Sequence, residues 1–304
     1  MKQFLKTIIP NKVWKLIREL LIIQGQNKTA IICDSIINNY TKFNSVQYAF
    51  SAKKALGNKP IIWQYWGQGY ENVPELVSIC LKSVEKYKGD YIIIRLTDEN
   101  LSEYIDLPDF VNEKRKLFSC AFFSDLLRCI LLSTYGGVWL DATVLLTGPL
   151  PKRYFDYDFF LFQRDKNELN QDYWENSFAH YYGWQKNFKV KMLSSVFFAK
   201  KKSLLVTTLT QLLLIYWKNE TKLHHYFFFQ ILFEQLISQH PEWNCPVESD
   251  CVPHIIQQII NADYQEVSFK QVIQMTSIHK LSYKDHNAVR KLKVLLNDYY
   301  GFNK

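Results

Sequence analysis

The chain has 304 residues, of which 48% are hydrophobic and 22% are charged, as is typical of a globular protein with a buried core. This length allows one large domain or two smaller ones. No apolar stretch reaches the roughly 18 residues expected of a membrane-spanning helix. The basic start of the chain has neither the long apolar run nor the small-residue cleavage site of a signal peptide. We therefore expect a globular protein without a transmembrane helix.

The net charge of +8 is concentrated in the first 54 residues, which hold nine Lys and Arg residues against two acidic residues. The rest of the chain is nearly neutral. A nucleic-acid enzyme more often spreads its basic residues along a groove, so we expect no nucleic-acid partner. The six cysteines form no Cys-x-x-Cys pair and no zinc-spaced cluster with histidine. They fit a reducing cytoplasm, although an even number also permits a disulfide.

Residues 11–24 have the pattern of an amphipathic helix, with cations such as Lys15 and Arg18 among apolar residues such as Trp14 and Leu20. A basic helix with Trp and Leu on its other face can lie in a membrane interface. Alternatively, the helix packs on the rest of the protein and its cations are only solvated. The strongly basic segment favours the membrane, and we expect residues 1–57 to form a helical extension of a domain that spans residues 58–304.

The predicted domain begins with alternating strands and helices. The apolar pattern predicts a strand over residues 61–65, a helix over 74–87 and a buried strand over 91–96. This β-loop-α-β order predicts a parallel, right-handed unit. The same patterns predict further elements along the chain: a helix near 101–105, strands at 158–162 and 194–199, and helices over 203–217 and 226–238.

The most informative stretch is residues 118–146, which predict a helix, a Gly-Gly stop and a short strand. The helix carries a polar trio, Ser124, Asp125 and Arg128. Because residues three and four apart share a helix face, we expect these side chains to converge. The enclosing residues are mostly apolar, and unpaired charges would be costly there. A functional role is therefore favoured over a surface ion pair.

The two glycines and the strand after them place a single carboxylate at the end of that strand. Gly136 and Gly137 end the helix, since glycine accepts the left-handed conformation found after helix ends. Residues 138–140 then predict a short apolar strand, and Asp141 follows it. In open α/β sheets, ligands bind outside the carboxyl ends of the strands. Asp141 is thus placed to contact a charged ligand.

At these residues the chain resembles a known family. Ser-Asp-x-x-Arg followed by Gly-Gly-x-x-x-Asp is similar to the donor site of glycosyltransferase family 32 and its capsular polysaccharide synthesis relatives, and large clostridial glycosylating toxins share the pattern. The likeness extends to IIWQYWGQG at residues 61–69 and to SIHKL at residues 277–281. It implies an α/β, GT-A-like (Rossmann-like) fold, with a mostly parallel sheet flanked by helices, that binds a sugar nucleotide and a divalent metal.

The resemblance also implies roles for single residues. Asp125 would bind sugar or ribose hydroxyls, Arg128 would hold sugar or phosphate oxygens, and Asp141 would act at the reacting centre. Further donor-binding candidates are Ser124, Trp66 as a base-stacking ring, Gly67, Gly137 and Lys280. The start of the 226–238 helix resembles a capsular-family segment near the acceptor, which makes His225 and Gln230 acceptor candidates.

The family's usual Asp-x-Asp pair is Asp141-Ala142-Thr143 in this chain. Paired carboxylates bridge manganese or magnesium to a diphosphate, and a threonine is a weaker, neutral ligand. The expected metal ligands are therefore Asp141, Thr143 and His279. Either the metal binds more weakly than it does to two acids, or cationic side chains take over part of its role.

Taken together, the resemblance implies an enzyme that transfers a hexose or N-acetylhexosamine from a nucleotide sugar, UDP-linked, to a hydroxyl of a capsular polysaccharide or lipid-linked glycan. It implies retention at the anomeric carbon. We expect a cytoplasmic location, peripheral at the inner face of the cell membrane. The alternatives are a sugar-nucleotide-binding protein without turnover and a glycosyltransferase that modifies proteins.

Overall fold

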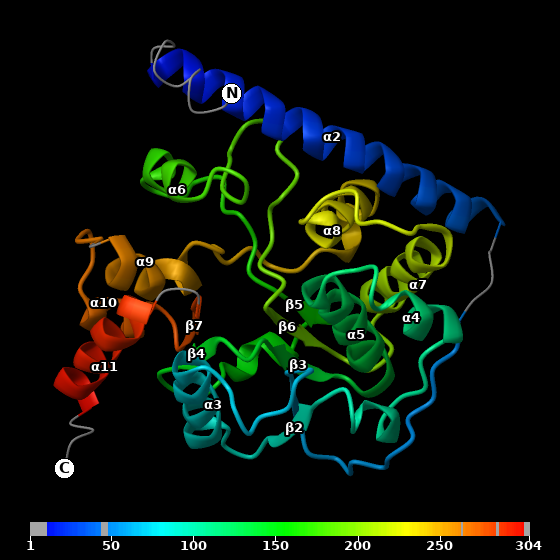
Figure 1. Ribbon diagram of the computed structural model, residues 1–304, viewed down its shortest axis with the longest axis horizontal. Coiled ribbons are helices and arrows are strands. Elements are labelled where there is room, and N and C mark those ends of the chain that lie inside the picture. Colours follow the sequence, from blue (N-terminus) through cyan, green and yellow to red (C-terminus); the bar gives the residue numbers. More distant parts are fainter. Residues whose placement is uncertain (1–10, 44–47, 263, 284–285, 301–304) are drawn as a thin grey trace.

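A five-stranded sheet forms the centre of the protein (Figure 1), in a computed structural model that describes residues 11–43, 48–262, 264–283 and 286–300. The strand order is β2-β1-β3-β6-β5. The bounds of these strands are β1 (Ile61–Tyr65), β2 (Ile92–Leu96), β3 (Gly137–Leu140), β5 (Phe159–Phe160) and β6 (Val196–Ala199).

The sheet is mixed. β2, β1 and β3 run parallel, whereas β6 pairs antiparallel with both β3 and β5. Parallel neighbours need a crossover connection, usually a helix, and α3 (Glu75–Tyr87) and α5 (Cys120–Tyr135) supply it. The α/β class is confirmed, but less of the sheet is parallel than expected, because the chain after β3 returns to the sheet in the opposite direction.

Helices cover the sheet and extend beyond it. α5 begins after Ser119, whose side chain accepts a hydrogen bond from the Phe122 N–H, and ends at Gly136, where φ is +75°. The remaining α-helices are α4 (Asp109–Lys114), α6 (Gln171–Ser177), α7 (Leu204–Asn219), α8 (Phe228–Gln239), α9 (Ile255–Ala262), α10 (Phe269–Met275) and α11 (His286–Tyr300). The helix expected near residues 101–105 is a short 3₁₀ turn, Leu101–Glu103.

The amino-terminal helix α2 (Asn11–Phe43) is longer than the 14 residues predicted. It lies along one edge of the molecule beside α8 (Figure 1). Its inner face is buried at positions such as Ala30, Cys33 and Ile37, and the Asp34 carboxylate accepts hydrogen bonds from Gln235 on α8. The inner face therefore packs on the domain, as one of the two sequence alternatives predicted.

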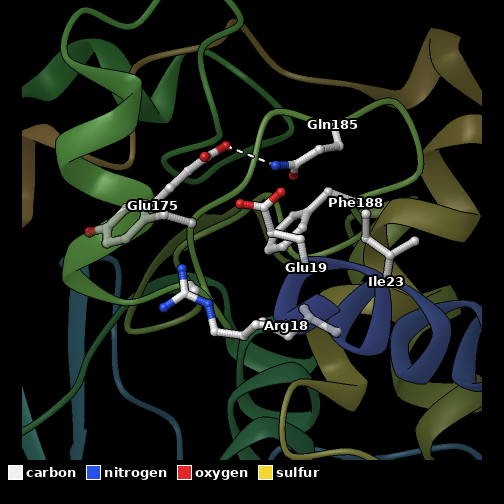
Figure 2. Close-up of a pocket in the computed structure, with 9 residues that line it drawn as sticks. Arg18, Glu19, Ile23, Glu175, Gln185 and Phe188 are labelled. Atoms are coloured by element: carbon white, nitrogen blue, oxygen red, sulfur yellow. Dashed lines mark hydrogen bonds between the residues drawn. The ribbon is translucent and has the colours of Figure 1, made fainter. Parts of the chain in front are cut away.

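The amino-terminal half of α2 meets α6. Lys15 forms ion pairs with Asp172 at 3.3 Å and Glu175 at 3.8 Å, so part of the basic excess is matched by acidic residues of the domain. Figure 2 shows a small cavity at this junction, where Gln185 donates a 3.0 Å hydrogen bond to Glu175. Its lining includes Arg18 and none of the residues predicted for the donor site.

A two-stranded ribbon completes the region next to β3. β4 (Val144–Leu146) pairs antiparallel with β7 (Ile278–Lys280), and Val144 lies opposite Lys280. The Leu281 N–H donates to the Thr143 carbonyl at 3.0 Å. The ribbon thus brings the end of the chain to the segment that follows the third strand.

Candidate active site

Asp141 lies directly after β3, at the carboxyl edge of the parallel strands. Its backbone N–H donates to the Ser195 carbonyl at 2.9 Å. The Trp139 indole N–H donates to its Oδ1 at 2.8 Å. The sequence indicated Trp139 only as an apolar strand residue. Side chains two residues apart on a strand point to the same face, so its spacing from Asp141 could have predicted this contact.

Arg128 links the helix trio to Asp141. Its Nη2 lies 3.2 Å from Asp141 Oδ1, and its Nη1 donates to Asp125 Oδ1. The Arg128 side chain is only 3% exposed. The guanidinium also lies 5.3 Å from the centroid of the Trp139 ring and 5.8 Å from that of Phe229. The structure therefore brings together the three residues predicted to be catalytic.

Lys280 approaches the same carboxylate from the other side. Its Nζ lies 3.3 Å from Asp141 Oδ2 and also donates to the Thr143 hydroxyl. His279 lies elsewhere, because successive side chains of a strand face opposite ways. It is buried, and its Nε2 lies 2.9 Å from the Thr147 hydroxyl. Thus Lys280 joins the site, and His279 is not brought to Asp141.

The two aspartates differ in their electrostatics. Burial raises the pKa of the Asp125 carboxyl to about 7, although the adjacent Arg128 opposes this rise. Burial alone would raise the pKa of Asp141 as well, but the cations of Lys280 and Arg128 outweigh it, so that pKa is lowered. At neutral pH Asp141 is therefore ionised, whereas the Asp125 carboxyl keeps its proton to a higher pH than Asp141 does.

The predicted glycines have structural explanations in the fold. Gly137 lies at the amino end of β3, opposite the Asp141 end, with a φ of +106°. An added Cβ there would be 2.4 Å from the Ile61 carbonyl oxygen, so the close approach of β1 requires glycine. A Cβ on Gly67 would lie 2.7 Å from the Tyr65 hydroxyl. Of these two glycines, only Gly67 lies at the carboxyl edge of the parallel strands, where Asp141 is.

A second polar group occupies this edge. Tyr65, the last residue of β1, donates its hydroxyl hydrogen bond to Asp98, which follows β2. Arg115 pairs with Asp98 at 2.5 Å and contacts the Tyr65 hydroxyl at 3.0 Å. The sequence did not single out these three residues, although each follows or ends an element that leads to the edge. They lie at the predicted nucleotide end, next to Gly67.

Aromatic rings stand at the outer side of the site. Trp66 is half-buried, and its ring centroid lies 5.6 Å from that of Tyr283 in an edge-on contact. Tyr226, which precedes α8, is 64% exposed. These rings could contact a flat base or a sugar face. Ser124, on α5 beside Asp125, is half-buried.

The donor atoms around Asp141 do not fit a divalent metal. In the ranges that the structure describes, no group of three or more His, Cys, Asp or Glu side chains is arranged to hold a metal ion. Both Asp141 oxygens already face cations, the Thr143 hydroxyl is engaged by Lys280, and His279 points elsewhere. Magnesium and manganese prefer several oxygen ligands, which this arrangement does not offer.

Comparisons with known proteins define the family. A solved chain titled "PaToxG Glycosyltransferase" is similar at 13% identity and a TM-score of 0.39, covering 91% of this chain and 98% of that one. A comparison with curated proteins gave no match. The model of the family described as "Capsular polysaccharide synthesis protein" matches residues 13–300. Since this match spans nearly the whole sequence, the chain belongs to the capsular polysaccharide synthesis protein family.

Proposed function

We propose that the protein is a glycosyltransferase that moves a hexose or N-acetylhexosamine from a UDP-linked donor to a hydroxyl of a surface polysaccharide or a lipid-linked glycan. One observation carries the proposal. Asp141, Arg128 and Lys280 converge at the carboxyl edge of the parallel strands, which is where open α/β sheets bind ligands. Membership in the capsular family supplies the glycan context.

The cluster suits a reaction in which a diphosphate departs. Negative charge grows on the leaving phosphate, and fixed cations aimed at that charge stabilise the transition state. Lys280 and Arg128 are such cations, both held by Asp141. Asp125 would accept hydrogen bonds from sugar hydroxyls and so orient the donor. With retention, the departing phosphate takes the acceptor proton on the same face, so no separate base is required.

The nucleoside would lie toward Trp66 and Gly67. The Trp66 and Tyr283 rings offer flat surfaces for a uracil, and aromatic stacking tolerates any base. The Tyr65–Asp98–Arg115 group beside them provides polar atoms for a ribose. The family resemblance implies a manganese or magnesium ion, but the oxygen atoms around Asp141 do not offer such an ion enough free ligands. No step of the proposed reaction uses a metal.

The acceptor side would be formed by the start of α8. Gln230 is 8% exposed, and its side-chain amide donates to the Ser194 hydroxyl at 3.1 Å. Its Oε1 has no hydrogen-bond partner in the described part of the chain. Ser194 precedes Ser195, whose carbonyl holds the Asp141 backbone. Gln230 is thus linked through Ser194 to the segment that holds Asp141, which favours it as an acceptor-side residue. His225, three residues before the first residue of α8, is a further candidate.

Peripheral attachment to a membrane would bring a lipid-linked acceptor to this site. The outer face of α2 exposes Leu16, Leu20 and Ile31 by 60%, 68% and 69%, and Lys28 lies on the same face. The two acidic residues of α2 are turned toward the domain, since Glu19 lines the cavity next to α6 and Asp34 accepts a hydrogen bond from Gln235 of α8. No helix among the described residues has the length and apolarity needed to cross a bilayer, so this contact would be interfacial.

The attachment is tested with vesicles. We expect wild-type protein to co-sediment with vesicles that contain anionic phospholipid, and the double variant Leu16→Glu/Leu20→Glu to stay in solution. The double variant Leu169→Glu/Leu204→Glu, which adds the same charge at two exposed leucines outside α2, is the matched control. Equal sedimentation of all three proteins would contradict a role for the outer face.

The donor site is tested by calorimetric titration of a panel of nucleotide sugars into wild type and Asp141→Ala. We expect one UDP-sugar to bind in preference to the others and to lose at least tenfold in affinity in the variant, because Lys280 and Arg128 lose the carboxylate that positions them. Urea unfolding of both proteins checks that the variant is folded. If wild type binds none of the nucleotide sugars, the proposed function is wrong.

A further inference from the structure

In an Asp-x-Asp pair, both carboxylates can face a metal. In this chain Asp141 and Thr143 hold those two positions, and Lys280 lies between their side chains. Its ammonium contacts both Asp141 and Thr143. We propose that this ammonium takes the place of the divalent cation, so that the protein binds the donor diphosphate without a metal. The inference rests on the proposed function, since it concerns how the same site recognises its donor.

The backbone fixes this arrangement before any ligand arrives. Val144 is the register partner of Lys280, and the Leu281 N–H donates to the Thr143 carbonyl at 3.0 Å. The β4–β7 ribbon therefore holds the lysine beside the turn that carries Asp141. Electrostatic stabilisation is strongest when the charges are preorganised in this way, because little reorganisation is then needed on binding.

The ammonium also keeps a donor for the ligand. A lysine has three N–H donors and no acceptor, and two are directed at Asp141 and Thr143. The Lys280 side chain is 24% exposed and that of Asp141 is 27% exposed, so the third N–H can reach a phosphate oxygen that enters from solvent. Lysine binds phosphate as a point charge in this manner.

The charges around Asp141 disfavour a second cation. Lys280 and Arg128 lie on its two oxygens at 3.3 and 3.2 Å. A divalent ion would have to displace one of them and would then face the repulsion of both. The replacement of the second acid by the neutral Thr143 removes the charge that would have offset this repulsion. Conversely, Lys280 and Arg128 already offset the carboxylates of Asp141 and Asp125 without a metal, and the partly exposed ammonium keeps an N–H for a diphosphate.

Calorimetric titration of nucleoside diphosphates distinguishes the possible outcomes. UDP, GDP, ADP and dTDP are titrated in EDTA and again with manganese. We expect one of them to bind with the same Kd, within twofold, under both conditions. Binding that requires manganese would overturn the inference and leave the proposed function standing. Absence of binding under both conditions would instead refute the proposed function.

Lysine variants test the residue itself. Lys280→Met should weaken binding in EDTA at least tenfold, whereas Lys280→Arg, which keeps the charge, should retain most of it. Lys191→Met is the matched control, since Lys191 is also paired with a carboxylate, Glu234, and its side chain is 34% exposed. Equal affinity of Lys280→Met and wild type in EDTA would overturn the inference. Thermal unfolding of each variant checks the fold.

Discussion

Two arginines with buried side chains each pair with an aspartate, and they differ in what they leave unsatisfied. The side chains of Arg164 and Asp250 are 2% and 0% exposed and meet through two hydrogen bonds of 2.8 and 2.9 Å. The side chain of Arg128 is equally buried, but that of its partner Asp141 is 27% exposed. The first pair is closed to solvent, and the second is open at one end.

The closed pair uses its donors within the protein. Besides Asp250, Arg164 donates to the carbonyls of Gly183 and Tyr181 at 3.1 and 3.0 Å. Its guanidinium lies 4.7 Å from the centroid of the Trp184 ring. Charged groups buried this deeply need such complete pairing. The pair therefore joins three irregular segments of the chain and has little left for a ligand.

The open pair keeps unused capacity. Arg128 Nε has no hydrogen-bond partner among the described residues, and Lys280 has an N–H to spare. The comparison teaches that burial of an ion pair does not by itself indicate a site. Access to solvent at one end of the pair does, since it lets a ligand reach Asp141 and Lys280.

The largest expected effect concerns the closed pair. Asp250→Ala would leave the Arg164 charge buried and unpaired, which should cost about 3–5 kcal/mol of unfolding free energy. Urea unfolding measures this loss. Asp141→Ala, whose cationic partner Lys280 can be solvated, should lose much less stability. Equal losses in the two variants would remove the distinction between the pairs.

The next effect concerns geometry in the open pair. Arg128→Lys keeps the positive charge but loses the planar fork that contacts Asp125 and Asp141 together. We expect turnover to fall about 100-fold, of the order seen when a preorganised donor is removed from an active site. Steady-state kinetics with the preferred donor measures this change. Near-normal kcat would mean that charge alone suffices at this position.

The third effect is a pH dependence of stability from Asp125. Its pKa is raised in the folded state, so the folded protein binds this proton more tightly than the unfolded chain does. The resulting stabilisation is complete below about pH 4 and is lost as the pH rises through about 7. The unfolding free energy of wild type minus that of Asp125→Asn should therefore fall across this window, by at most about 1.4 kcal/mol per pH unit. A difference that stays constant with pH would contradict the raised pKa.

The smallest effect concerns the indole that holds Asp141. Trp139→Phe removes one hydrogen bond and keeps most of the packing, which should weaken donor affinity by about 1 kcal/mol, or roughly fivefold. Calorimetric titration of the donor measures it. Trp174→Phe, at a buried tryptophan outside the cluster, is the control. A larger loss in the control than in Trp139→Phe would point to packing as the cause.

The sequence predicted those parts of the site that depend on local spacing. Asp125 and Arg128 share a face because they are three residues apart, and Asp141 follows a strand that its apolar neighbours predicted. Lys280 is 139 residues from Asp141 in the chain, and only the family resemblance pointed to it. Neighbouring residues of a strand face opposite ways, so a predicted strand would have shown that Lys280 and His279 cannot both face Asp141. The five-residue motif at 277–281 did not by itself predict where β7 begins and ends.

Other features depend on tertiary packing that no local pattern encodes. Arg164 and Asp250 are 86 residues apart and lie in irregular segments, so nothing in the sequence indicated that they pair. The length of α2 was underestimated because Gly25 interrupts the apolar pattern. In the structure Gly25 has open space around it, and the buried face beyond it continues the helix.

Turnover of the preferred donor tests the central claim most directly. Wild type and Asp141→Asn are incubated with the UDP-sugar that binds best, and release of UDP is measured with and without a glycan acceptor. We predict slow release by wild type alone, acceleration by an acceptor, and a loss of at least about 100-fold in the variant. Binding without release under any acceptor or metal condition, or equal release by both proteins, would contradict a glycosyltransferase centred on Asp141.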